Sequence, residues 1–301
     1  MKPFYTLLLL LFVLNNLSAQ QNHQIDSLKV ALKSAKNAAD KLSTYDLLAN
    51  KMAYSNADSA LLISNEYLNL AIESKDEVRI TKAKNTRGLC YFLNSDYKNA
   101  SIYFIQAIKE FEKQGDKYNV AVALNNLAAS YEHIESPEAT IKNFKKAHEI
   151  FKEIKNTKWI GISAGNLSNN YLQKLNDLPN AEKYAKIAVE SAKITGEKTR
   201  QAEASLTLGN VLFTAKKYTE AANAYDNVTK LVNADSYPLL FGSARVNQGS
   251  CLNETADYES AIRVTNEAKE VFTKQKSWLY VNIAWQGLIE IYQRKNDFKL
   301  A

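Results

Sequence analysis

Side chains that carry acid–base or metal chemistry are scarce in this chain of 301 residues, which has three histidines and two cysteines. A zinc site needs three or four converging ligands, usually His, Cys or a carboxylate. His133 and His148 are fifteen residues apart, and neither has a cysteine or a second histidine close to it in the sequence. We therefore predict no metal, no cofactor and no catalytic residue in residues 20–301.

Sequence motifs that mark an enzyme are also missing. The chain has no glycine-rich phosphate loop, no nucleophile elbow and no close Cys/His arrangement. The segment KAHEIFKEI places His148 beside Glu149, which is loosely similar to the phospho-accepting helix of histidine kinases. Because the rest of that kinase pattern is missing, we interpret His148 as an ordinary helix position. The sequence predicts a binding protein and not an enzyme.

Amino-acid composition limits the possible fold classes and the possible types of binding partner. The chain has only nine glycines and four prolines, which favours a helical protein over a β-rich one. The net charge is +6, but the lysines are interleaved with glutamates and do not form a basic block. This distribution argues against nucleic acid as the main partner.

The first residues are typical of an export signal. Lys2 is followed by the apolar run FYTLLLLLFVL and by LSAQ, with Ala19 at a position that signal peptidase accepts. The run is too short to cross a bilayer, which needs ~20 apolar residues. We predict a signal peptide over residues 1–19 that is cut after Ala19. Contact with a membrane is expected only through a segment beyond residue 301.

An internal repeat organises the rest of the chain. One pattern recurs in three segments: TRGLCYFLNSDYKNASIYFIQAIKEF at 86–111, NLAASYEHIESPEATIKNFKKAHEIF at 126–151 and TLGNVLFTAKKYTEAANAYDNVTKLV at 207–232. Each has a small anchor residue, a polar turn and then an aromatic. The anchors are Gly88, Ala128, Ser168, Gly209 and Gly249, spaced by 40, 40, 41 and 40 residues, and a further copy fits at Ile289.

Each repeat predicts a pair of packed helices. In the first helix, residues four before, one before and three after the anchor form one stripe, as Leu124, Leu127 and Tyr131 do. The second helix has its own apolar stripe, and a small anchor lets the two helices approach closely. We assign five tyrosines to this packing and not to a stacking site; they are Tyr91, Tyr131, Tyr171, Tyr225 and Tyr292.

This pattern resembles the tetratricopeptide repeat. The last copy matches the family's tryptophan, leucine, small, tyrosine, aromatic and alanine places with Trp285, Leu288, Ile289, Tyr292, Phe298 and Ala301, although isoleucine replaces the small residue. The long period is similar to that of kinesin light chains and bacterial peptide-sensing regulators. The resemblance implies an all-α, right-handed superhelical solenoid of helix-turn-helix repeats.

The predicted organisation is an amino-terminal helix at 20–40, containing QIDSLKVALKSA, followed by a solenoid at 41–301. Its repeats are about 41–80, 81–120, 121–160, 161–201, 202–241, 242–281 and an incomplete 282–301. The copy at 161–201 has an extra residue in its turn, NDLPN, and the copy at 41–80 keeps only Leu47, Leu48 and Ala60 clearly. Because Phe298 and Ala301 would open a second helix, we expect this sequence to be part of a longer protein.

The repeat also predicts free cysteines. Cys90 and Cys251 each follow an anchor by two residues, in copies four repeats apart. Packed helix axes are ~8–10 Å apart, so a separation of four repeats is far greater than the Cα distance of about 7 Å that a disulfide allows. We expect two thiols, even though an exported protein can keep disulfides.

Asparagines gather on the face of the first helices opposite the packing stripe. In the tetratricopeptide family this face lines the concave, ligand-binding side. Either it binds a peptide or protein, or its asparagines are merely solvated. Leu89, Leu206 and Val246 share this face. The candidate binding residues are Asn85, Asn125, Asn126, Asn166, Asn169, Asn210 and Asn247.

Export together with long repeats resembles the sensory region of histidine kinases and LuxR-type regulators of the Bacteroidetes kind. The resemblance implies a non-catalytic, periplasmic module of a Gram-negative bacterium that binds a protein or peptide within a longer membrane-bound signalling protein. One alternative is an exported scaffold or adaptor without signalling output. Another is the repeat region of an exported enzyme whose catalytic domain lies beyond residue 301.

Overall fold

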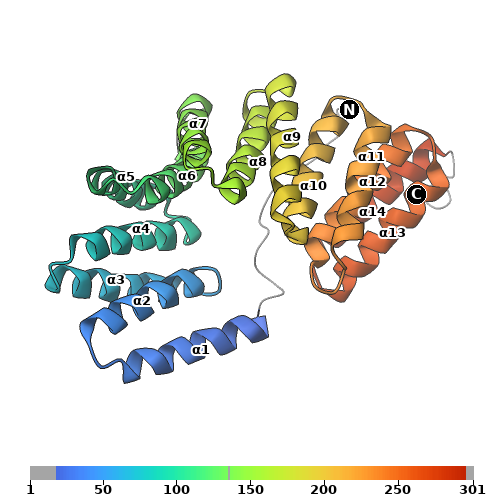
Figure 1. Cartoon of the computed structure of the whole chain (residues 1–301). Helices are drawn as coiled ribbons and strands as arrows, with labels where there is room; N and C mark the ends of the chain where they lie inside the picture. Colours follow the sequence, from blue (N-terminus) through green and yellow to red (C-terminus); the bar gives the residue numbers. More distant parts are fainter. Residues whose placement is uncertain (1–17, 135, 296–301) are drawn as a thin grey trace. The chain divides into compact units, whose positions relative to one another are not determined.

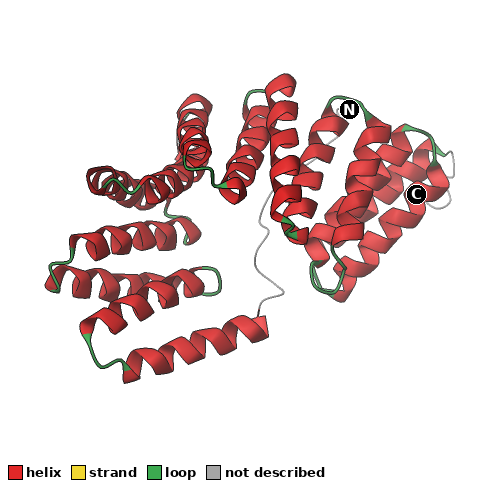
Figure 2. Ribbon diagram, viewed as in Figure 1, coloured by secondary structure: helices red, strands yellow, loops and turns green. Residues whose placement is uncertain are grey.

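The computed structural model describes residues 18–134 and 136–295. These residues form fourteen α-helices and no β-strand (Figure 2), which confirms the predicted all-α class. Residues 1–17 of the predicted signal peptide, and Phe298 and Ala301 of the last copy, lie outside the described residues.

The helices belong to two compact units that meet in the sequence between Asn156 and Thr157. The first unit contains α1 (Ser18–Ser34), α2 (Ala38–Ala53), α3 (Ala57–Glu73), α4 (Glu77–Leu93), α5 (Tyr97–Gln114), α6 (Lys117–Ile134) and α7 (Pro137–Glu153). The second contains α8 (Thr157–Lys174), α9 (Leu178–Thr195), α10 (Lys198–Thr214), α11 (Tyr218–Leu231), α12 (Pro238–Glu254), α13 (Tyr258–Lys274) and α14 (Trp278–Arg294). Figure 1 labels the helices of each unit in chain order.

Each predicted complete repeat supplies one helix pair, from α2 and α3 to α12 and α13. The pairs begin a few residues earlier than predicted, because α2 begins at Ala38 and α4 at Glu77. Helices adjacent in the sequence pack on each other within each unit, and first helices of successive repeats also touch, as α2 and α4 do. The fold therefore places the first helices side by side within a unit.

Short turns with a common chemistry end and restart the helices. The second helix of most repeats begins at a capping side chain that accepts a hydrogen bond from a backbone N–H three residues later, as at Asn56, Asp96 and Asp177. One residue before the cap, the backbone adopts a left-handed conformation in several copies, with φ of 61° at Ser95 and 62° at Ala256. This combination reverses the chain within a few residues.

The anchor residues set the distance between the paired helices. A Cβ atom on Gly88 would lie 2.8 Å from Phe104 of the second helix, and one on Gly209 would lie 2.6 Å from Tyr225. In both pairs the aromatic follows the anchor by sixteen residues and is buried. At the anchor Ser168, a hydrogen bond joins the paired helices α8 and α9. The Ser168 hydroxyl donates to the carbonyl of Ala181 at 2.8 Å.

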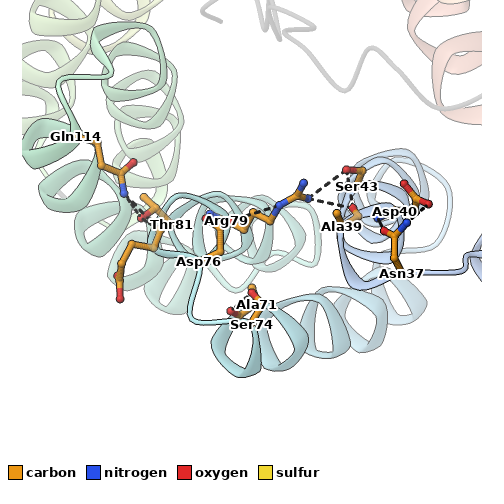
Figure 3. Close-up of polar contacts among 11 residues, drawn as sticks. Asn37, Ala39, Asp40, Ser43, Ala71, Ser74, Asp76, Arg79, Thr81 and Gln114 are labelled. Carbon is orange, nitrogen blue, oxygen red and sulfur yellow. Dashed lines mark hydrogen bonds and ion pairs between the residues drawn. The ribbon is translucent and has the colours of Figure 1, made fainter.

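Polar side chains join helices both between successive repeats and within one repeat. The Arg79 guanidinium donates to the Ala39 carbonyl at 3.3 Å and to the Ser43 hydroxyl at 3.1 Å, which joins α4 to α2 (Figure 3). On the other side of α4, Gln114 of α5 donates to the Thr81 hydroxyl at 2.9 Å. These bonds fix the register of α2, α4 and α5.

The predicted extra residue of NDLPN lies in the turn between α8 and α9. The Asp177 N–H donates to the carbonyl of Tyr171, six residues earlier, whereas the corresponding Asp96 N–H donates to Tyr91, five residues earlier. The insertion is absorbed by this wider turn, with Asn176 in a left-handed conformation at φ 50°.

Candidate binding surfaces

The histidines do not converge in the structure. His148 is 3% exposed on the inner side of α7, and the exposed His133 stacks on Tyr97 with ring centroids 3.9 Å apart. Within residues 18–134 and 136–295, no group of three or more His, Cys, Asp or Glu side chains could hold a metal ion.

Both cysteines are buried thiols in separate units. Cys90 packs among Ala49, Met52 and Ala53 of α2. Burial raises the pKa of Cys90 to about 11 and that of Cys251 to about 12. Neither thiol is therefore activated as a nucleophile.

Three of the predicted packing tyrosines, Tyr91, Tyr171 and Tyr225, fill gaps between paired helices. The Tyr171 and Tyr184 rings stack across α8 and α9 with centroids 5.6 Å apart, and those of Tyr91 and Tyr103 stack across α4 and α5 at 5.5 Å. Tyr225 is almost completely buried. These rings stabilise the helix pairs.

In the first unit, the three predicted asparagines differ in accessibility. Asn85 on α4 and Asn126 on α6 are partly exposed, whereas Asn125 is 6% exposed. The Oδ1 atom of Asn85 is buried and accepts no hydrogen bond from the described residues. Asn85 and Asn126 are therefore the two candidate asparagines of this unit that a ligand can reach.

In the second unit, Asn210 is committed to packing. It is 2% exposed, and its Oδ1 accepts a 2.7 Å hydrogen bond from the Tyr225 hydroxyl and a 3.2 Å bond from Nδ2 of the partly exposed Asn247. Asn169 is 8% exposed, and its Oδ1 has no donor among the described residues. Asn166 is partly exposed. The face predicted from sequence is thus a mixture of packing and accessible amides.

A second surface, not predicted from the sequence, is an apolar cleft of about 580 Å³ between α5, α6 and α7. Its apolar lining is Ile105, Ile108, Leu124, Leu127 and Ile150, and its polar lining is Lys109, Glu112, Asn143, Lys145, Lys146 and Glu149. Leu124 and Leu127 come from the first helix α6 and are buried, while the flanking second helices supply all the charges.

The corresponding position of α12 is bridged by polar groups. Arg245 and Gln248 replace Leu124 and Leu127 in the repeat register. The Arg245 guanidinium lies 3.4 Å from the Asp226 carboxylate of α11 and 2.9 Å from the Glu267 carboxylate of α13. One long side chain therefore joins both flanking helices, which two leucines cannot do.

The corresponding position of α4 is filled in another way. Arg87, which takes the place of Leu127, donates from Nε to the Tyr103 hydroxyl at 3.0 Å and from Nη2 to the Tyr91 hydroxyl at 3.2 Å. Only the 121–160 copy has branched aliphatic residues at both register positions. That difference between copies is the signal by which the cleft could have been found from sequence.

Comparison with known families agrees with the geometry. Residues 79–153 match the model of the tetratricopeptide repeat family, and helix pairs of the same kind continue through the described residues on both sides. Residues 79–153 are therefore tetratricopeptide repeats, and the other helix pairs share their fold. No curated protein matches the chain.

Solved structures share this fold at low sequence identity. The apo form of the quorum sensor NprR from B. thuringiensis is 16% identical over 91% of this chain and 76% of that chain, with a TM-score of 0.64. NprR in complex with its cognate peptide NprX is 15% identical over 94% and 83%, with a TM-score of 0.57. The STAND protein PH0952 from Pyrococcus horikoshii, which has a tetratricopeptide repeat sensor, is 14% identical over 93% of this chain and 47% of its own, with a TM-score of 0.65. These likenesses concern the fold alone.

Proposed function

We propose that this chain is an extracytoplasmic module that binds a partner protein or an extended peptide through the asparagine face of its first helices. We also propose that it is the sensory part of a longer, membrane-bound signalling protein, either a histidine kinase or a LuxR-type regulator. The observation that carries the binding proposal is that Asn85 on α4 and Asn126 on the adjacent first helix α6 are both partly exposed.

An asparagine amide suits the recognition of peptide backbone. Its side chain offers two donors and one acceptor oxygen, so it can pair with the N–H and C=O of a peptide unit whatever the peptide's side chains are. Asn126 lies on the neighbouring first helix α6, which touches α4. Each such bond contributes on the order of 1 kcal/mol net, so several repeats would be needed for useful affinity. NprR, which has the same fold, has been solved with a peptide bound.

The test compares two double variants of the first unit. Asn85→Ala/Asn126→Ala removes the accessible amides of α4 and α6. Asn65→Ala/Asn69→Ala is the matched control, because those asparagines are exposed on the second helix α3. Both should keep the helical circular dichroism of the parent. We expect the first variant alone to lose retained envelope proteins or peptides, and equal retention by both would overturn the proposal.

The compartment and the output require separate measurements. The described residues contain no helix long and apolar enough to cross a membrane. Export predicts that the mature chain begins at Gln20 and is found in the periplasmic fraction. The signalling proposal predicts that the coding sequence continues into an apolar segment of ~20 residues and then a kinase or helix-turn-helix domain. A mature chain that retains Met1 would contradict the export proposal. A stop codon soon after Ala301 would contradict the signalling proposal.

A further inference from the structure

We infer a second binding site in the cleft between α5, α6 and α7, for an acidic, amphipathic segment of a partner protein. Aliphatic side chains of that segment would insert between α5 and α7, and its carboxylates would lie against Lys109 and Lys146. This site is independent of the proposed asparagine face.

The two surfaces lie on opposite sides of α6. An α-helix turns by ~100° per residue, so Leu124 and Asn126 are ~200° apart, and so are Leu127 and Asn125. The leucines form the floor of the cleft. A ligand in the cleft therefore does not compete directly with one on the asparagine face.

The floor of the cleft is apolar and large enough to receive several side chains. Ile105 and Ile108 of α5, Leu124 and Leu127 of α6 and Ile150 of α7 line about 580 Å³ of open space. Removing such surface from water is the main driving force for association. In α12 the Arg245 bridge occupies the corresponding position, so this cleft is not a general consequence of the repeat.

Charge at the rim of the cleft selects the partner. Three lysines and two glutamates line it. Glu149 is already paired with Lys152 at 2.8 Å, and Lys145 has an interaction of its own. Lys109 of α5 and Lys146 of α7 form no ion pair with a described residue. Of the two glutamates that line the cleft, only Glu112 also lacks an ion pair with a described residue.

An occupant with carboxylates beside aliphatic side chains satisfies both features. Lys109 and Lys146 come from opposite walls, so two carboxylates on the edges of an apolar stripe could meet one lysine each. A basic segment of the same hydrophobicity would face two lysines and lose this attraction. Complementary rim charges mainly set partner choice and association rate, which makes charge reversal the appropriate test.

The experiment measures binding of short fluorescent peptides to the full chain by fluorescence anisotropy. The first peptide has leucines along one helical face and glutamates elsewhere. The second has lysine in place of each glutamate, and the third has serine in place of each leucine. We expect the Glu/Leu peptide to bind at least about tenfold more tightly than either of the others, which corresponds to about 1.4 kcal/mol. Its binding should weaken with added salt.

Charge-reversal variants locate the site. Lys109→Glu/Lys146→Glu should weaken the Glu/Leu peptide by about tenfold or more and improve the Lys/Leu peptide. Lys98→Glu/Lys142→Glu is the matched control, since both lysines are exposed on α5 and α7 outside the cleft and the change in net charge is identical. Lys109→Gln/Lys146→Gln provides the same test with a smaller perturbation if the reversal impairs folding.

Several outcomes would overturn the inference. Equal weakening by both charge-reversal pairs would mean that binding reports only net charge. Loss of binding in Asn85→Ala/Asn126→Ala would place the peptide on the asparagine face, and that result would leave the proposed function standing. Equal affinity for the acidic and basic peptides, or no measurable binding of the acidic peptide, would also refute the site.

Discussion

A close contact between the paired helices α10 and α11 gives the sharpest stability prediction. We consider Gly209→Ala in α10. An added Cβ would lie 2.6, 2.8 and 2.9 Å from Cε1, Cδ1 and Cζ of Tyr225, where ordinary contact begins at 3.4 Å. The Tyr225 ring would have to retreat by about 0.8 Å in a closely packed core. That ring is 1% exposed, and its hydroxyl is bonded to Asn210.

Three contributions to the free energy of unfolding decide whether Gly209→Ala stabilises or destabilises the protein. Alanine is favoured over glycine within a helix by about 1 kcal/mol. Overpacking of a filled core costs about 1–3 kcal/mol. Losing the buried Tyr225–Asn210 hydrogen bond costs about 1–3 kcal/mol more. We therefore expect a net destabilisation of about 1–5 kcal/mol.

Gly165→Ala in α8 is the matched control. Gly165 lies in the same unit and in the interior of a first helix, but a Cβ added there would have nothing within 4 Å. The helix preference should then act alone and stabilise the unit by about 0.5–1 kcal/mol.

Urea unfolding followed by circular dichroism measures both changes. For an unfolding slope of about 1–3 kcal/mol per molar urea, a loss of about 2 kcal/mol lowers the midpoint by roughly 1 M. Gly165→Ala should shift the midpoint slightly upward. If Gly209→Ala were as stable as the parent, or if both variants shifted the midpoint in the same direction, the assignment of Gly209 as a close-packing anchor would be wrong.

Four further predictions test other parts of the structure. Burial raises the pKa of Cys90 to about 11 and of Cys251 to about 12, so a thiol reagent at pH 8 should label neither in the folded chain and both in urea; rapid labelling of the folded chain would contradict this. Burial raises the pKa of Asp46 despite its bond from Thr86, so the folded state holds this proton more tightly and stability declines as pH rises from the unfolded pKa through the folded pKa. Asp46→Asn should therefore raise the melting temperature at pH 7 but not at about pH 3, below the ordinary pKa of ~3.9. A rise in melting temperature at pH 3 without one at pH 7 would refute this prediction. Arg245→Met should destabilise the second unit by about 1 kcal/mol in urea, because Asp226 and Glu267 lose a shared partner and keep only Lys230 and Arg263; full stability in that variant would argue against the bridge. Leu279 and Trp278 of α14 are 68% and 66% exposed, so we expect this apolar face to promote self-association. Leu279→Glu should then sediment with a smaller associated fraction than the parent, and equal sedimentation of the two would contradict the prediction.

The repeat pattern predicts the helix pairs because they depend on contacts within one copy. A small residue at Gly88 and an aromatic at Phe104 specify close packing wherever they recur. The boundary between the two units could not be predicted in this way. Lys155, just before it, has the same left-handed backbone as Lys75, with φ of 53° at both, so local turn chemistry does not distinguish the boundary from an ordinary repeat junction.

The asparagine face shows a second limit of sequence reasoning. Helical geometry gives the direction of each side chain, but burial depends on residues from another helix. Asn210 is enclosed because Tyr225 of α11 and Asn247 of α12 both reach its Oδ1. Asn85 occupies a neighbouring register position in another copy, and its oxygen meets no such donor in the described residues.

The cleft shows how function can arise where copies of a repeat differ. The positions four and one before the anchor accept different side chains, which are Leu124/Leu127, Lys84/Arg87 and Arg245/Gln248 in three of the copies. Their reach differs, however. Arg245 extends to carboxylates on both flanking helices, whereas a leucine ends at the floor and leaves the space between α5 and α7 open. Since the fold tolerates either solution, these two positions are free to vary for binding, and comparing copies at a fixed register is the way to find such sites in a repeat protein.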